Sequence, residues 1–226
     1  LLHFIDPKNF MLENFAESDF YKFHSQSSNL ILNEFKFLNK FISEGVYQKA
    51  YYLNTNHEFK ALTDTLNLIN DRLNVKFKNL IGKRIRYINL SNPFGVIQSL
   101  TLSENTNIIF ISLNNPKILI SEQIIHEATH LKFNELIKVA KYETLFDFGF
   151  SWYSPFASKV RSIELIVNGH LAYCSVKAFY EELYINSKEE DRIAFEINDK
   201  EFIQKRINKI NDLLDHSNEM ISLLFG

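Results

Sequence analysis

Hydrophobic residues in the first third of the chain recur at the spacing of amphipathic helices. In residues 29–42 they form one broad apolar stripe, and residues 59–73 repeat that spacing. The period then shortens to that of β-strands in three runs that turn-forming residues separate: 85–90, 96–102 and 107–113. We therefore predict N-terminal helices within residues 1–80 and a small antiparallel sheet within residues 81–115.

Helical spacing returns after Pro116. A first helix is expected from a cap at Ser121 to about Val139. A second is expected to begin at Ser154, which a proline follows as at many helix starts, and to run to about Leu183. An aromatic-rich loop joins the two helices.

The remaining residues, 184–226, are again helical in pattern after a polar break. No repeat or low-complexity linker interrupts the chain. The sequence therefore predicts one domain of the α+β class, mostly α-helical, in which residues 116–183 follow the sheet and hold the candidate chemistry.

Composition excludes several classes of protein. The 226 residues are 46% hydrophobic, and 25 basic residues against 27 acidic ones give a net charge of -2, which does not favour nucleic acid or an anionic membrane surface. No apolar run reaches the roughly 18 residues that a membrane span needs. One cysteine allows no intramolecular disulfide, and the first residues lack the features of a signal peptide, so we expect a cytoplasmic protein.

The chemistry of the chain centres on the run HEATH, residues 126–130. On a helix, positions four apart stack on one face, so His126 and His130 can reach one metal ion while Glu127 projects about 100° around the helix. This is the HExxH pattern, in which the carboxylate lies beside the metal. The alternative is a pair of surface histidines with no ligand.

Two histidines hold a divalent ion poorly, so a third ligand is expected from the helix after Pro155. Glu164 and His170 are the candidates, on different sides of that helix. Glu164 shares a polar stripe with Arg161 and Asn168, and such a stripe needs partners because unpaired polar groups are costly to bury. Asn168 could accept a hydrogen bond from a ligand imidazole. Alternatively, Glu164 pairs with Arg161, and His170 is a core histidine.

A strand before an HExxH helix, with a second long helix after it, resembles the arrangement of zincin-like metalloenzymes. Glu164 with Asn168 one turn later also resembles the ExxxD motif of the glutamate-ligated zincins, with Asn in place of Asp. As zinc ligands, two histidines and a carboxylate support hydrolysis, with Glu127 as the base. As iron(II) ligands they form the facial triad of oxygenases, and the motif alone leaves both chemistries open.

Wider similarity favours the second chemistry. Residues 90–183 resemble the HExxH-type peptide β-hydroxylases, proposed 2-oxoglutarate-dependent enzymes associated with ribosomally made, modified peptides. The family pattern HExxHxKxN, its aromatic-Pro-aromatic segment and its later arginine match nine positions here: His126, Glu127, His130, Lys132, Asn134, Tyr153, Pro155, Phe156 and Arg161. The chain departs from the family at Ala157 and Ser162, where members often have Arg and Pro.

The resemblance implies an iron(II) enzyme that uses dioxygen and 2-oxoglutarate to hydroxylate a side chain of a peptide, which could be a precursor with a leader segment. The implied metal ligands are three: His126, His130 and Glu164. Arg161 would bind the far carboxylate of 2-oxoglutarate, and Glu127 would orient water or a substrate group. The peptide could lie along an edge strand such as residues 107–113. A zinc metallopeptidase with the same ligands is the alternative.

Overall fold

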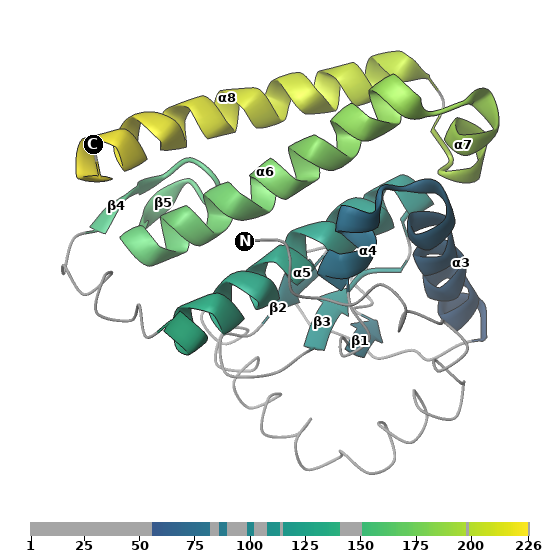
Figure 1. Cartoon of the computed structure of the whole chain (residues 1–226), viewed down its shortest axis with the longest axis horizontal. Helices are drawn as coiled ribbons and strands as arrows, with labels where there is room; N and C mark the ends of the chain where they lie inside the picture. Colours follow the sequence, from purple (N-terminus) through teal and green to yellow (C-terminus); the bar gives the residue numbers. More distant parts are fainter. Residues whose placement is uncertain are drawn as a thin grey trace, which may run out of the picture.

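Three long helices dominate the computed structural model. They lie alongside one another (Figure 1) and are α5 (Lys117–Ala140), α6 (Ile163–Asn186) and α8 (Lys200–Phe225). The residues that the structure describes are 56–81, 86–89, 99–101, 108–113, 115–140, 151–197 and 199–225. The mostly helical character expected from the sequence is confirmed for these residues.

Two shorter helices, α3 (Asn56–Arg72) and α4 (Val75–Ile81), pack against α5. Leu62, Leu66 and Ile69 of α3 are buried at the spacing of one helix face, so the helix predicted over 59–73 is confirmed. The helix predicted over 29–42 lies outside the described residues.

A three-stranded sheet precedes α5, with strands β1 (Arg86–Asn89), β2 (Ser99–Thr101) and β3 (Ile108–Ile111) in the order β1-β3-β2. β2 and β3 are antiparallel as expected, but β1 and β3 are parallel, so the prediction of an all-antiparallel sheet was wrong. β3 is also the central strand rather than an edge, and the face that carries Ile109 and Ile111 is apolar and fully buried. β3, which is the described part of the strand expected over 107–113, therefore has no free edge to offer to a peptide.

α5 begins at Lys117, four residues before the predicted cap at Ser121. A carboxylate from far along the chain caps it instead, since Glu196 Oε2 accepts from the Lys117 amide at 3.0 Å. The Ile118 amide donates to the Phe195 carbonyl oxygen at 3.1 Å. These bonds replace the intrahelical partners that the first turn lacks, so Ser121 lies inside the helix and is buried.

Residues 151–162 form a β-hairpin where the sequence predicted the start of a helix. Its strands are β4 (Ser151–Ser154) and β5 (Lys159–Ser162), and α6 begins only at Ile163. The Ser154 carbonyl accepts from the Ala157 amide at 3.3 Å, and Ser158 adopts a left-handed φ of 51°, which together close the turn. Arg161 consequently lies on a strand, and the helical stripe that joined it to Glu164 and Asn168 does not exist.

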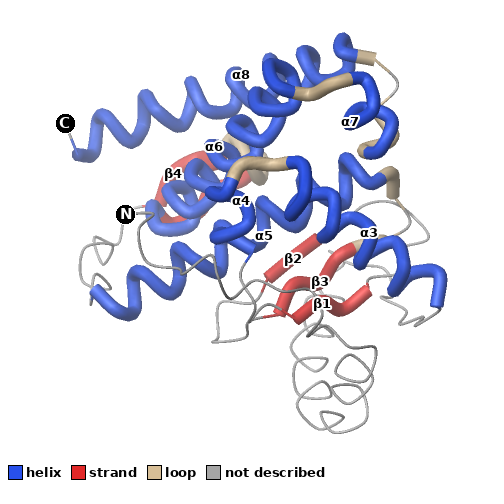
Figure 2. The backbone as a smooth tube through the Cα atoms, turned by 45° about the vertical axis from the view of Figure 1, so that its right-hand side comes forward, coloured by secondary structure: helices blue, strands red, loops and turns tan. Residues whose placement is uncertain are grey.

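α5 lies between two layers, which explains why it is apolar on more than one side (Figure 2). One side contacts β2 and β3, and another contacts α6, which in turn packs on α8. Ile124 and Ile125 of α5, Val176 and Phe179 of α6, and Ile210 of α8 are fully buried in the common core. Burying such a side chain stabilises the fold by about 1.5–3 kcal/mol.

α6 ends at Asn186, and a short helix, α7 (Glu189–Ala194), connects it to α8. The predicted break between α6 and the C-terminal helices is therefore confirmed. None of the helices in the described stretches combines the length and the apolarity that crossing a membrane requires.

Candidate metal centre

The two histidines of the HExxH run converge at the middle of α5. His126 Nε2 and His130 Nε2 lie 3.0 Å apart, and the two rings meet edge to face. Two nitrogens about 2.1 Å from one ion are about 3.0 Å apart at right angles and about 3.4 Å apart in a tetrahedron. The separation therefore suits two ligands of a single metal ion.

Asn168 of α6 fixes the orientation of His130. Asn168 Oδ1 lies 2.7 Å from His130 Nδ1, and Asn168 Nδ2 donates to Asn134 Oδ1 at 3.4 Å. Because the amide oxygen accepts, His130 Nδ1 carries the proton and Nε2 presents its lone pair toward His126. The hydrogen bond expected between Asn168 and a motif imidazole is therefore present, and it leaves the second histidine in the tautomer that binds a metal.

We expect Asn168→Ala to weaken the binding of zinc(II) by about 10–100-fold, because His130 then loses the partner that fixes its tautomer. Asn168→Asp keeps an acceptor at the same place and should bind zinc(II) at least as tightly as the parent chain. Dissociation constants from competition with a coloured chelator measure both. Asn186→Ala, at the exposed far end of the same helix, is the control. Equal affinity for the parent and for Asn168→Ala would contradict the role given to Asn168.

Glu127 is turned toward the sheet. Its carboxylate is buried, and Oε1 accepts from the Ser99 hydroxyl of β2 at 2.8 Å. The second oxygen, Oε2, has no hydrogen-bond partner among the described residues. Burial raises the pKa of Glu127 above the usual carboxyl value, although the charge of His130 and hydrogen bonds from Ser99 and Thr101 act in the opposite direction. The carboxylate is thus held by β2.

Burial also governs His126. Removal from water, followed by the charges of His130 and Arg206, lowers the pKa of His126 to about 3. The imidazole is therefore neutral near pH 7, as a metal ligand must be.

Aromatic contacts hold His126 from the side of α6. The Tyr173 ring lies edge-on to His126, with centroids 5.1 Å apart, and stacks on Phe156 at 4.9 Å. Phe156 comes from the hairpin turn and lies against Gly169, where an added Cβ would approach the phenyl ring to 2.9 Å. Gly169 is therefore required for this approach, and a continuous row of rings joins the hairpin to the motif.

A partly buried ion pair lies one turn before His126 on the same face of α5. Arg206 of α8 bonds both oxygens of Glu122, with Nε 3.0 Å from Oε2, and the Tyr180 hydroxyl donates to Oε2 at 2.5 Å. The side chains of Arg206 and Glu122 are only 26% and 13% exposed. The pairing of Glu122 with Arg206 and Tyr180 was not predicted from the sequence. The position of Glu122 could have indicated a pairing, because it lies four residues before His126 on a largely apolar stretch of α5.

The two candidates for the third ligand are not gathered around the histidines. His170 turns toward α8, since its Nδ1 lies 2.7 Å from Ser217 Oγ and its Nε2 lies 3.4 Å from Cys174 Sγ. Ser217 donates to the Leu214 carbonyl, so it accepts from His170, and this histidine joins two helices. His170 is thus half-buried between α6 and α8 rather than a core histidine, and its partner is a serine side chain.

Glu164 lies in the first turn of α6, one turn before Asn168 and half-buried. Within the described residues no group of three or more His, Cys, Asp or Glu side chains is placed to hold a metal ion. The assignment of Glu164 as third ligand stays a prediction. Lys132, another position that matches the family pattern, pairs with Glu135, and Lys132 Nζ lies 2.7 Å from Glu135 Oε2.

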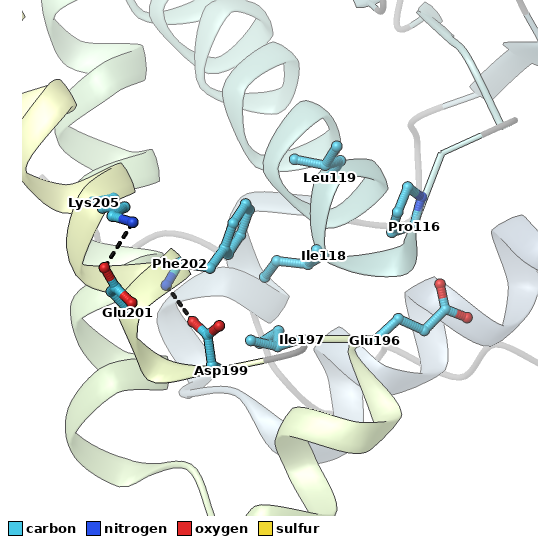
Figure 3. Close-up of a pocket in the computed structure, with 9 residues that line it drawn as sticks. All are labelled: Pro116, Ile118, Leu119, Glu196, Ile197, Asp199, Glu201, Phe202 and Lys205. Carbon is cyan, nitrogen blue, oxygen red and sulfur yellow. Dashed lines mark hydrogen bonds and ion pairs between the residues drawn. The ribbon is translucent and has the colours of Figure 1, made fainter.

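A separate cavity of about 340 Å³ opens beside the first turn of α5, where the chain passes from α7 into α8 (Figure 3). Ile118, Leu119 and Phe202 give it apolar walls. The charges at its rim are already engaged, because Glu201 pairs with Lys205 and Asp199 accepts from the first turn of α8. None of residues 126–130 lines this cavity.

The described centre thus consists of His126 and His130, whose ring nitrogens converge, and the buried carboxylate of Glu127. Asn168 fixes the tautomer of His130. Comparisons with protein-family models, with curated proteins and with solved structures find no match to this chain.

Proposed function

We propose that the chain is an iron(II)- and 2-oxoglutarate-dependent hydroxylase that acts on the β-carbon of a peptide side chain. The observation that carries the proposal is the pair of histidine nitrogens 3.0 Å apart, one of them fixed as a lone-pair donor by Asn168. His126 and His130 would hold the metal, and Glu164 is the third ligand that we propose.

The bound iron and 2-oxoglutarate would supply the oxidising power. In such a reaction one oxygen atom of dioxygen would enter a C–H bond of the peptide, and the other would pass to 2-oxoglutarate, which would leave as succinate and carbon dioxide. The protein itself would hold the metal and shield the reacting groups from water. Tyr173, which lies edge-on to His126, would shield the metal from water, and Glu127, which accepts a hydrogen bond from Ser99, would orient a water molecule or a substrate group.

A cation for the far carboxylate of 2-oxoglutarate has two candidates. Arg161 matches the family position but lies on β5, opposite Trp152. The charge of Arg206 contributes to the lowered pKa of His126, but Glu122 already bonds Arg206. We retain Arg161 as the proposed anchor and treat Arg206 as its rival.

A zinc metallopeptidase is the second candidate, and one observation favours it. Glu127 Oε2 is buried beside the histidine pair without a hydrogen-bond partner among the described residues, and its pKa is raised. Such a carboxylate oxygen is suited to take a proton from a water molecule during hydrolysis.

Anaerobic purification, loading with iron(II) and incubation with 2-oxoglutarate and dioxygen test the first proposal. The expected result is succinate above the level given by a His126→Ala chain, together with one equivalent of bound iron. One equivalent of zinc with no succinate would overturn it. The peptidase candidate instead requires that the zinc-loaded chain cleave a peptide such as casein and that Glu127→Gln abolish the cleavage.

A further inference from the structure

The β4–β5 hairpin carries exposed apolar side chains beside positive charge. Trp152, Tyr153 and Val160 are 40%, 55% and 65% exposed. Lys159 is also exposed, and residues 151–162 contain no Asp or Glu. Exposed aromatic side chains next to cations are typical of surfaces that bind other molecules.

β5 has an alternating pattern along its length. Lys159, Val160 and Arg161 follow one another, and successive side chains of a strand point to opposite faces. The two cations therefore share one face of the hairpin, and Val160 lies on the other face opposite Tyr153. In the described part of the chain β5 pairs with β4 alone, so its outer edge is free to accept an extended segment.

The hairpin is also close to the histidines. Phe156 lies in its turn and stacks on Tyr173, which contacts His126 edge-on. Two ring contacts thus separate the turn of the hairpin from the HExxH pair. A segment lying along β5 would place its neighbouring residues near the centre.

We infer that the outer edge of β5 binds an extended peptide in which acidic and apolar residues alternate. The peptide's carboxylates would meet Lys159 on one face, and its apolar side chains would meet Val160 on the other. Main-chain hydrogen bonds to the strand edge give affinity in this mode, and alternate side chains give specificity. The inference rests on the proposed function, for which it names the substrate class.

Binding can be measured without metal or 2-oxoglutarate, which separates this inference from the proposed reaction. The probe is a fluorescein-labelled peptide of alternating glutamate and leucine, added to the full metal-free chain and followed by anisotropy. Trp152 is the only tryptophan in the chain, so its emission reports whether binding occurs at the hairpin. We expect saturable binding, a shift in that emission and weakening as salt increases.

Two substitutions on β5 and two matched controls locate the site. Lys159→Glu and Val160→Ser should each raise the dissociation constant by about 10-fold or more, by charge repulsion and by lost apolar contact. Lys209→Glu and Ile185→Ser make the same changes at exposed positions on α8 and α6 and should have no effect.

Three results would overturn the inference: no saturable binding, equal binding of a peptide with lysine in place of glutamate, or equal binding of a peptide with its glutamates and leucines in two blocks. The last peptide has the same charge and composition but cannot match the alternation of β5. If the peptide did not bind at β5 but succinate was formed, the proposed reaction would be supported and only the proposed docking site would be rejected.

Discussion

Replacement of His130 by alanine is expected to weaken the binding of zinc(II) or iron(II) by about three orders of magnitude. His130 supplies one of the two nitrogens that converge to 3.0 Å, and Asn168 has already fixed its tautomer, so little reorganisation is needed when the metal binds. Without it, His126 is left as a single buried imidazole. Competition titration with a chelator of known affinity measures the change.

His216→Ala is the matched control, since His216 is an exposed histidine of α8 whose Nδ1 lies 2.7 Å from the Asp212 carbonyl oxygen. It should leave metal affinity unchanged. His170→Ala should also leave it unchanged, because His170 faces Ser217 and Cys174. If His170→Ala removed the metal and His130→Ala did not, the centre would lie between α6 and α8 instead.

Arg206→Met is expected to destabilise the fold by about 3–5 kcal/mol, because it leaves the Glu122 carboxylate partly buried without its cation. Two guanidinium nitrogens bond that carboxylate, so Arg206→Lys should recover only part of the loss. The double variant Glu122→Gln with Arg206→Met should recover most of it, since the neutral amide still accepts from Tyr180. Urea unfolding followed by circular dichroism gives the free energies.

Arg72→Met provides the comparison at the surface. Arg72 bonds Asp191 at 3.0 Å but its side chain is 42% exposed, so its removal should cost no more than about 1 kcal/mol. If Arg206→Met lowered the free energy of unfolding as little as Arg72→Met, Glu122 would be readily accessible to water. The ion pair would then not shield His126 from solvent.

The helices that carry the centre could be predicted from sequence because their apolar spacing is local. The HExxH geometry followed from the same rule, since residues four apart on one helix need no tertiary information. The bond between Asn168 and His130 joins residues 38 apart, yet it too was foreseen, because a polar group on an apolar helix has few possible partners.

The β4–β5 hairpin and the ion pair of Glu122 with Arg206 could not be predicted from the sequence, each for a different reason. Ser154 and Pro155 have the composition of a helix start, but Ser158 at positive φ turns the chain into a second strand, and local preference does not reveal that choice. Glu122 and Arg206 are 84 residues apart, so their pairing depends on how α5 and α8 pack. The parallel pairing of β1 with β3 is likewise set by tertiary contacts.

The polar face of α5 also determines how its neighbours are aligned. Glu122, His126, His130 and Asn134 lie on four successive turns, and each meets a specific partner on α6 or α8. Apolar contacts alone are non-directional and would tolerate a shift of one helical turn. Such a shift would move Tyr180 away from Glu122 and Asn168 away from His130, leaving buried polar groups unpaired at a cost of several kcal/mol. The residues proposed to bind the metal therefore also select a single register for the helices around them.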